Sequence, residues 1–167
     1  AVKAGASMIN DISAGEIDNK MLDTVAKLNV PYILMHMKGT PKTMQENPVY
    51  QNVVEEINLF FEGKIRQLKN KGINQIILDP GFGFGKTIEH NFEILQSFDK
   101  FQKHGYPVLA GLSRKSFIYK TLGVSAAESL KGTIAMNEDA LKKGAKILRV
   151  HDVKEAKELI ILNDKLS

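Results

Sequence analysis

Most of the information about the fold lies in Leu78-Asp79-Pro80-Gly81-Phe82-Gly83-Phe84-Gly85-Lys86. An apolar run, Ile76-Ile77-Leu78, ends on the carboxylate of Asp79, and a glycine-rich turn follows at once. An unbroken apolar run is typical of a parallel strand buried on both faces, and glycine lets the backbone approach a ligand closely. Because α/β proteins place their chemistry at the carboxyl ends of parallel strands, the stretch predicts a functional strand end at Asp79.

The same stretch argues against a nucleotide-binding phosphate loop. Such a loop has four residues between its first glycine and the Gly-Lys-Thr that closes it. Here only three residues separate Gly81 from Gly85, which precedes Lys86-Thr87. Starting one residue earlier places Pro80 at the glycine position, and proline lacks the N–H that cradles phosphate. The glycines therefore indicate a tight, shaped turn.

Length and composition indicate a single domain over residues 1–167, with 43% apolar and 25% charged residues. No stretch approaches the roughly 18 apolar residues of a membrane span, and no signal peptide is visible, so we expect no membrane partner. The absence of cysteine excludes disulfides and thiolate chemistry and fits a cytoplasmic location. The net charge of +4 is mild and its basic residues are scattered, which favours an anionic small substrate over nucleic acid.

Short apolar runs alternate with amphipathic stretches along the chain. The runs predict strands over residues 7–11, 31–37, 75–79, 107–112 and 146–151, and the stretches predict helices over 18–28, 52–70, 89–103, 126–143 and 153–166. A strand followed by a helix, repeated, gives right-handed crossovers and a parallel sheet. The apolar stripe of the 52–70 helix is expected to pack on that sheet.

Nearly every predicted strand ends on polar residues, namely Asn10-Asp11, His36, Asp79, Ser113-Arg114-Lys115, and Arg149 with His151. Polar groups at the end of every strand are typical of a βα-barrel, whereas an open doubly wound sheet concentrates them at one switch point. We therefore predict an α/β fold of the TIM (β/α)8 barrel family, with the doubly wound sheet as the alternative. Only five βα units are visible, and residues 1–6 read as the last turn of a helix, so we expect an N-terminally truncated partial barrel.

Two cations follow the fourth predicted strand. The quartet Ser113-Arg114-Lys115-Ser116 reads as an N-cap at Ser113 and a helix that runs to about Leu122. Its cations then lie in the first turn, where the helix dipole disfavours them, and a broken local rule points to a functional site. A cation beside free helix N–H groups suits an oxyanion, a phosphate or a carbonyl oxygen. Gly111 leaves room there for a flat ring.

Other strand ends carry weaker signals. Arg149 and His151 are two residues apart and share a face, where arginine offers phosphate a bidentate fork. Asn10 is ambiguous by itself, Asp11 is expected to cap a loop or face the helices, and Asp152 is expected to cap the last helix. The histidines lack metal-ligand spacing, and no residues suggest a catalytic triad, so neither a zinc site nor a covalent nucleophile is expected.

The chain resembles the dihydropteroate synthase family of folate biosynthesis in five blocks. They are Met8-Ile9-Asn10-Asp11-Ile12, Leu34-Met35-His36-Met37-Lys38-Gly39-Thr40-Pro41, Leu78 to Lys86 as quoted above, Gly111-Leu112-Ser113-Arg114-Lys115-Ser116 and Arg149-Val150-His151-Asp152. The last three together are highly specific. The family is a TIM barrel, a transferase and a sulfonamide target. It joins 6-hydroxymethyl-7,8-dihydropterin diphosphate to p-aminobenzoate and releases pyrophosphate with the help of Mg²⁺.

The resemblance implies a role for each matching residue. It implies pterin binding by Asn10, Met35, Asp79, Gly111 and Lys115, diphosphate binding by Arg149 and His151, a p-aminobenzoate edge at Phe84 and Ser116, and catalytic roles for Lys115 and Asp79. In this scheme the bond from the pterin methylene to the diphosphate breaks and the amine attacks the methylene. The protein mainly positions the reactants and stabilises the departing charge.

The family's magnesium-binding Asn, a further pterin-contacting Asp and two mobile loops have no match in this sequence. The resemblance therefore implies no metal ligand in this chain, and a chain that by itself is inactive or nearly so. It also implies that the full-length protein is a homodimer.

Two other interpretations stay open. One is a pterin-binding methyltransferase module that acts beside a corrinoid protein and needs no diphosphate clamp. The other is a non-enzymatic half-barrel that assembles with another chain or with itself, because unpaired sheet edges invite pairing.

Overall fold

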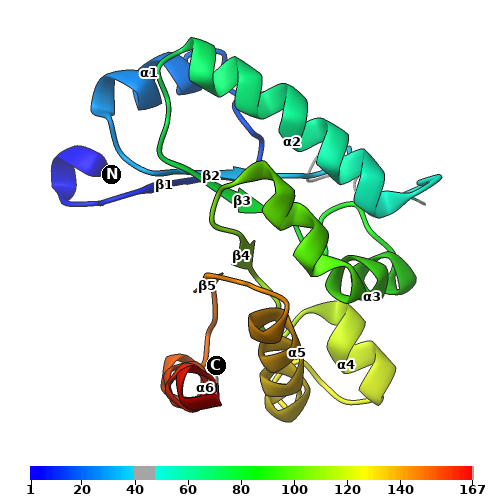
Figure 1. The fold of residues 1–167 in the computed structure, drawn as a ribbon. Helices are drawn as coiled ribbons and strands as arrows, with labels where there is room; N and C mark the ends of the chain where they lie inside the picture. Colours follow the sequence, from blue (N-terminus) through cyan, green and yellow to red (C-terminus); the bar gives the residue numbers. More distant parts are fainter. Residues whose placement is uncertain (40–47, 167) are drawn as a thin grey trace.

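The computed structural model describes residues 1–39 and 48–166, and it shows a curved row of parallel strands with helices around its outer side (Figure 1). The strands are β1 (Ile9–Asp11), β2 (Tyr32–Met35), β3 (Ile76–Asp79), β4 (Leu109–Ala110) and β5 (Ile147–Leu148). The helices are α1 (Met21–Leu28), α2 (Val53–Asn70), α3 (Ile88–Gln96), α4 (Ser116–Leu122), α5 (Leu130–Lys142) and α6 (Val153–Leu166), with 3₁₀ segments η1 (Val2–Ala4) and η2 (Phe98–His104). Thr40 and Pro41, from one of the blocks that carry the resemblance, lie outside the described residues.

All pairings between these strands are parallel. β1, β2 and β3 form one sheet and β4 and β5 a second, and a single bridge between Leu78 and Val108 joins the two. The strands therefore lie side by side in chain order, each connected by a helix on the same side. The predicted partial barrel of the TIM family is confirmed, and in the described part of the chain it is open between β1 and β5.

The main core lies between the strands and the outer helices. α2 begins where the Asn52 side chain accepts a hydrogen bond from the Glu55 N–H, and its predicted apolar stripe packs inward, with Ile57, Phe61 and Leu68 wholly buried. On the opposite face of the strands, Ile33, Ile77 and Leu109 form a separate small cluster with Ile147. That cluster marks the inner face of the partial barrel.

Three predicted helices have other bounds than expected. The helix expected over 18–28 begins at Met21. The helix expected over 89–103 ends at Gln96 and continues as η2, because a 3₁₀ turn aligns residues three apart and so brings both Phe98 and Phe101 into the core. The helix expected from residue 126 begins at Leu130. Ahead of it the Ser125 N–H and hydroxyl both bind the Glu128 carboxylate and form a separate turn.

The N-cap predicted at Ser113 is wrong. α4 begins at Ser116, and Lys115 occupies the cap position. The chain turns at Arg114, which has a left-handed φ of 54° and donates its N–H to the Thr133 hydroxyl. Ser113 is thereby buried under the turn and is free to contact another strand end.

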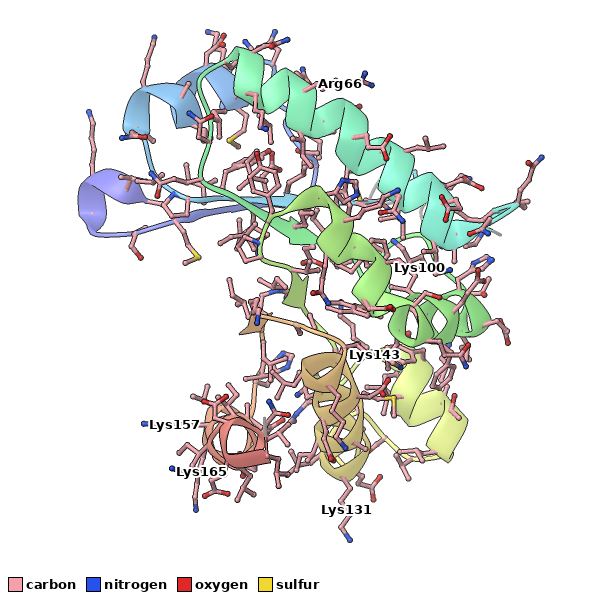
Figure 2. All side chains as sticks on the ribbon, viewed as in Figure 1. Arg66, Lys100, Lys131, Lys143, Lys157 and Lys165 are labelled. Carbon is pink, nitrogen blue, oxygen red and sulfur yellow. The ribbon has the colours of Figure 1, made fainter. Side chains whose placement is uncertain are left out.

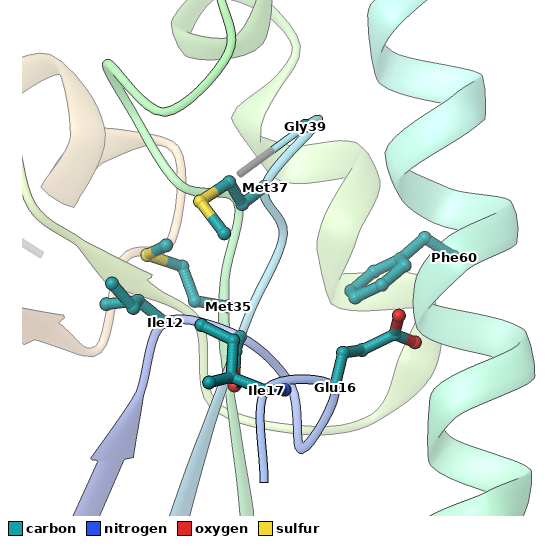
Figure 3. A pocket seen from close by; sticks show the side chains of 8 residues that line it. Ile12, Glu16, Ile17, Met35, Met37, Gly39 and Phe60 are labelled. Carbon is teal, nitrogen blue, oxygen red and sulfur yellow. Dashed lines mark hydrogen bonds between the residues drawn. The ribbon is translucent and has the colours of Figure 1, made fainter. Parts of the chain in front are cut away.

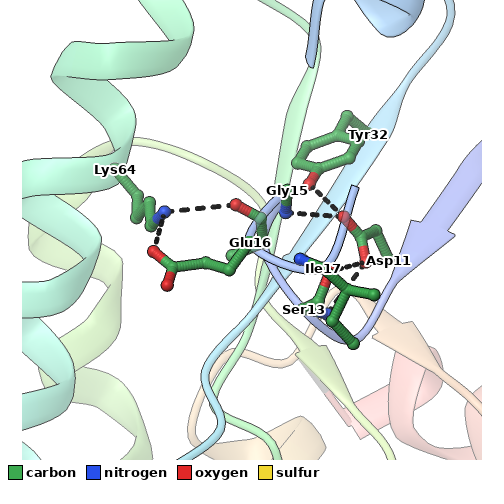
Figure 4. A network of polar contacts seen from close by, with 8 residues as sticks. Asp11, Ser13, Gly15, Glu16, Ile17, Tyr32 and Lys64 are labelled. Carbon is green, nitrogen blue, oxygen red and sulfur yellow. Dashed lines mark hydrogen bonds and ion pairs between the residues drawn. The ribbon is translucent and has the colours of Figure 1, made fainter. Parts of the chain in front are cut away.

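Asp11 caps the loop after β1, as predicted (Figure 4). Its carboxylate accepts hydrogen bonds from the Ser13 N–H and hydroxyl, the Gly15 N–H and the Tyr32 hydroxyl, all at 2.7–2.8 Å. Burial acts to raise the pKa of Asp11, but these hydrogen bonds hold it below its ordinary value. Lys64 on α2 binds the same loop through Glu16, so β1 is joined firmly to the helix layer.

The turn after β3, here called the glycine-rich loop (residues 81–86), packs on the end of β2. Gly81 and Gly85 both have positive φ, and a Cβ on them would overlap the carbonyl oxygens of His36 and Lys38. Only glycine allows the loop to lie this close to the neighbouring backbone. None of the described helices combines the length and the hydropathy that a membrane crossing requires.

We expect Gly81→Ala to lower the free energy of unfolding by more than about 2 kcal/mol, because a left-handed backbone costs alanine about 1–2 kcal/mol and the overlap with His36 adds to it. Urea unfolding followed by circular dichroism measures the change. Gly63→Ala is the matched control, since a Cβ there meets nothing within 4 Å and alanine favours the exposed helix by roughly 0.5–1 kcal/mol. Equal midpoints for the two variants would contradict the packing described.

Candidate active site

Three of the predicted pterin-binding residues lie on the inner face at the strand ends. In the register of the sheet Asn10 of β1 is opposite Ile33 of β2, a member of the inner cluster. Two residues further along β2, Met35 is opposite Asp79 of β3. Side chains two residues apart share a face of a strand, so Met35 follows Ile33 and Asp79 follows Ile77. Met35 and Asp79 are fully buried, whereas Asn10 is exposed.

Asp79 is a carboxylate with 0% exposure. Its Oδ1 accepts a hydrogen bond of 2.8 Å from the Gly81 N–H, whereas Oδ2 has no hydrogen-bond partner among the described residues. The closest cation to Oδ2 is Arg149, whose Nη2 lies 3.6 Å away. Burial raises the pKa of Asp79, and the Gly81 N–H, Arg149, Lys86 and Lys115 act against that rise. The site thus holds a buried acceptor oxygen without a donor.

The predicted cations gather around this carboxylate. The guanidinium of Arg149 passes over Gly111, so closely that a side chain at that glycine would overlap it. Lys115 reaches back over the glycine-rich loop, and its Nζ lies 4.5 Å from the centre of the Phe84 ring. Burial and the neighbouring Arg149 lower the pKa of Lys115, and Asp79 opposes this. The structure therefore brings Asp79, Gly111, Lys115, Arg149 and Phe84 together.

His151 lies next to this group and is held by Ser113. The Ser113 hydroxyl oxygen accepts the His151 backbone N–H at 3.2 Å and lies 3.0 Å from its Nδ1. Within the described residues these are its hydrogen bonds, so we infer that the hydroxyl proton goes to Nδ1. A hydroxyl proton shared with Nδ1 leaves Nε2 as the ring nitrogen that can donate.

A second contact joins the same two loops. The Arg114 side chain binds Asp152 through two parallel hydrogen bonds of 2.6 and 3.1 Å. Asp152 directly precedes α6, where the sequence predicts a cap. The contacts of its carboxylate among the described residues are those with Arg114. Arg114, one of the two cations that the sequence placed in a helical first turn, is accordingly a link between loops. Lys115 is the N-cap residue of α4, and its neighbour Ser116 is the first residue of that helix.

A cavity of about 460 Å³ opens beside this group at the ends of β1 and β2 (Figure 3). Its walls are mostly apolar, and it is lined by Ile12, Ser13, Glu16, Ile17, Met35, Met37, Gly39 and Phe60. Met35 belongs both to this cavity and to the inner face next to Asp79. An apolar space with few polar groups at its edge suits a flat organic ring.

The residues present do not form a magnesium site. The described part of the chain contains no group of three or more His, Asp or Glu side chains able to hold a metal ion. Asp79 faces lysine and arginine rather than the further oxygen ligands that Mg²⁺ prefers.

Two residues of the site were not predicted. The sequence predicts a helix cap at Ser113, and Lys86 belongs to a block that carries the resemblance but receives no role of its own there. Lys86 has 4% exposure, and its ammonium lies inside the glycine-rich loop. One signal in the sequence could have indicated it. Lys86 directly follows a run of glycine and phenylalanine, and a lysine buried in such a loop must find its acceptors on the backbone.

A family model of pterin-binding enzymes matches residues 1–151. The chain belongs to this pterin-binding family. It is 44% identical over 162 residues to the dihydropteroate synthase of Haemophilus influenzae, covering 96% of this chain and 58% of that protein. The family predicted from the five sequence blocks is thereby confirmed.

Solved structures of pterin-binding enzymes superpose closely on the chain. The Yersinia pestis dihydropteroate synthase in a sulfonamide complex has a TM-score of 0.95 at 39% identity, covering 98% of this chain and 60% of that one. The Xanthomonas albilineans enzyme in complex with 7,8-dihydropteroate has a TM-score of 0.91 at 37% identity, covering 99% of this chain and 61% of that one. The chain thus spans about three fifths of these relatives.

We expect Ser113→Ala to shift the His151 tautomer away from the form protonated on Nε2, because Nδ1 loses the hydroxyl that we infer to be its donor. Nitrogen chemical shifts of the imidazole distinguish the two tautomers. The variant should also lose about 1 kcal/mol of stability with the buried hydrogen bonds. Ser125→Ala, which removes an exposed hydroxyl bound to Glu128, is the control. An unchanged His151 tautomer in the Ser113 variant would refute the assignment.

Proposed function

We propose that this chain carries the pterin-binding and diphosphate-binding part of a dihydropteroate synthase. The observation that supports it most is the buried Asp79 Oδ2, an acceptor without a donor at the point where three cations converge. The identity to enzymes of that name over nearly the whole chain points the same way. The product-bound relative adds that a protein of this shape accommodates 7,8-dihydropteroate.

In this proposal Asp79 recognises the pterin ring. The ring presents an amino group and a ring N–H side by side, and a carboxylate with one free oxygen can accept from them. Lys115 donates to the oxygen and nitrogen on the ring, while Met35 and Gly111 line its faces and Asn10 contributes a further polar contact. Arg149 then balances the negative charge of the Asp79 carboxylate.

Arg149 and His151 are proposed to bind the diphosphate. The guanidinium supplies paired donors, and the Nε2–H of His151, set by Ser113, supplies another. As the bond between the methylene carbon and the diphosphate oxygen breaks, negative charge grows on the leaving group. Donors already fixed in place stabilise that charge without reorganisation, which lowers the barrier.

The second reactant is proposed to be p-aminobenzoate, held at the edge formed by Phe84 and Ser116. Its amine nitrogen forms a bond to the methylene carbon, pyrophosphate departs, and the amine releases a proton. No covalent intermediate with the protein is needed. Lys115, which lies against Phe84, can contact both reactants and is the proposed catalytic cation with Asp79.

A cytoplasmic location and a homodimeric full-length protein are part of the same proposal and rest on the family resemblance. A second candidate is a half-barrel that pairs with another chain. It is favoured by the sheet edges at β1 and β5, which have no strand partner on one side within the described residues. Light scattering separates the two, because a chain that stays monomeric at high concentration argues against pairing with itself.

We expect the chain to bind 6-hydroxymethyl-7,8-dihydropterin diphosphate more tightly than the corresponding alcohol. We expect Asp79→Asn to weaken that binding by about 1–3 kcal/mol, roughly 5- to 150-fold. Asparagine keeps the shape but replaces the free acceptor by an amide. Isothermal titration calorimetry measures both. Asp99→Asn on the exposed surface of η2 is the control. Tighter binding of methyltetrahydrofolate, with no gain from the diphosphate, would favour the methyltransferase interpretation instead.

We expect little or no turnover from this chain when both substrates and Mg²⁺ are supplied, because about two fifths of the enzymes it matches have no counterpart in it. Pyrophosphate release, followed by a coupled colorimetric assay, measures the rate. The Haemophilus influenzae enzyme assayed alongside supplies the reference. Turnover within tenfold of that reference would contradict the expectation.

A further inference from the structure

Lys86 is a cation enclosed by the loop to which it belongs. Its Nζ donates to the carbonyl oxygens of Gly81 and Phe84 at 2.9 Å each, and it lies 3.1 Å from Nδ1 of His36. The His36 carbonyl oxygen lies further away, at 3.4 Å. An ammonium has three N–H donors, and four acceptors surround this one, three of them within 3.1 Å.

The imidazole of His36 is neutral and can act as an acceptor. Burial, with the nearby cations Lys86 and Lys38, lowers the pKa of His36 to about 2. Burial also lowers the pKa of Lys86 to about 7, which Asp79 opposes and Lys115 reinforces. Oxygen and nitrogen acceptors on several sides favour the charged ammonium, as buried charges require.

The carbonyl groups that Lys86 binds are the two ends of the turn that carries Phe84. The Phe84 N–H also closes this turn on the Gly81 carbonyl oxygen, at 3.1 Å. Other contacts hold the flanks, since Asn91 accepts the Gly83 N–H and the Tyr50 hydroxyl donates to the Gly85 carbonyl. Lys86 is the only one of these partners that joins both ends of the turn to the neighbouring strand end at His36.

We propose that Lys86 is a positioning residue, whose ammonium holds the glycine-rich loop on β2 so that Phe84 faces Lys115 and the Gly81 N–H meets Asp79. The effect of Lys86 on ligand binding rests on the proposed function, whereas its effect on the position of the loop does not. In this proposal Lys86 does not touch the ligand. It acts through the backbone of residues 81–84 and through its charge.

The charge of Lys86 also bears on Asp79. The cations that face this carboxylate are Arg149 from beyond β5, Lys115 from the β4–α4 loop and Lys86 from the glycine-rich loop. In the proposed function Arg149 also binds the diphosphate and Lys115 also binds the pterin ring, so a bound ligand would compete for both. Lys86 is enclosed and keeps its effect when the site is filled.

Exchange of the backbone amides tests the loop directly, with no ligand present. In Lys86→Met, which keeps most of the volume and loses the charge, we expect the Phe84 and Gly83 amides to exchange roughly tenfold faster or more. Amides of α2 should not change. Lys100→Met removes an exposed lysine of η2, labelled in Figure 2, and is the matched control. Unchanged protection at Phe84 and Gly83 would overturn the proposal.

Chemical modification at position 86 separates the effect of the side chain's charge from the effect of its volume. It also tests the proposal if Lys86→Met does not fold. The chain contains no cysteine, so Lys86→Cys supplies a single thiol. Alkylation in urea with 2-bromoethylamine gives a side chain of lysine's length with an ammonium, and iodoacetamide gives a neutral one. After refolding, only the aminoethylated chain should regain wild-type protection of the loop amides. Equal protection, or equal failure to refold, of both alkylated chains would refute a role for the ammonium.

Ligand binding separates this inference from the proposed function. In the aminoethylated chain, affinity for the dihydropterin diphosphate should follow the wild-type pH profile. In the neutral chain the acid limb should move to higher pH, since Asp79 loses a cation that lowers its pKa. A wild-type chain that binds no pterin would contradict the proposed function, while the exchange measurements would still decide whether Lys86 holds the loop.

Discussion

Asp79 has no exposed surface, and a carboxylate in such a place is stable as an anion only when donors and cations surround it. Each loop around it supplies one such group. The glycine-rich loop provides the Gly81 N–H, the β4–α4 loop provides Lys115, and the chain beyond β5 provides Arg149. The three loops must therefore converge on one point. Gly81, Gly83 and Gly85 in the glycine-rich loop and Arg114 in the β4–α4 loop adopt positive φ.

The loops are joined to each other by polar contacts that lie away from the cavity. Arg114 with Asp152, and Ser113 with His151, join the turns after β4 and β5, and Lys86 joins the glycine-rich loop to β2. Such contacts restrict the side chains that face a ligand before the ligand arrives. Preorganisation of this kind matters most for a reaction in which the protein mainly orients reactants and stabilises a leaving group.

The sequence predicted the elements well where one local rule dominated. β2, β3 and β4 are buried throughout and read as apolar runs, and the less buried β1 and β5 were also predicted. Asn52 and the apolar stripe marked α2. The prediction was wrong where a distant contact decided the backbone. Serine is a common N-cap residue, but the Arg114 N–H binds the Thr133 hydroxyl, and the helix starts only at Ser116. The helix predicted over 89–103 ends early because Phe98 and Phe101 both enter the core. Lys86 was missed because all its acceptors but His36 Nδ1 are backbone carbonyl groups, which every residue possesses and no sequence pattern marks.

By itself the sequence determined the order of strands and helices, the family, and which residue types stand at each strand end, since these depend on periodicity and on motifs within one segment. Only the tertiary structure decided how those strand ends act on one another. It placed Arg149 over Gly111 and beside Asp79, gave Ser113 to His151, and enclosed Lys86. These arrangements depend on which donor meets which acceptor across segments far apart in the chain, and hydrogen-bond geometry over such separations is set by the packing of strands and helices rather than by local sequence.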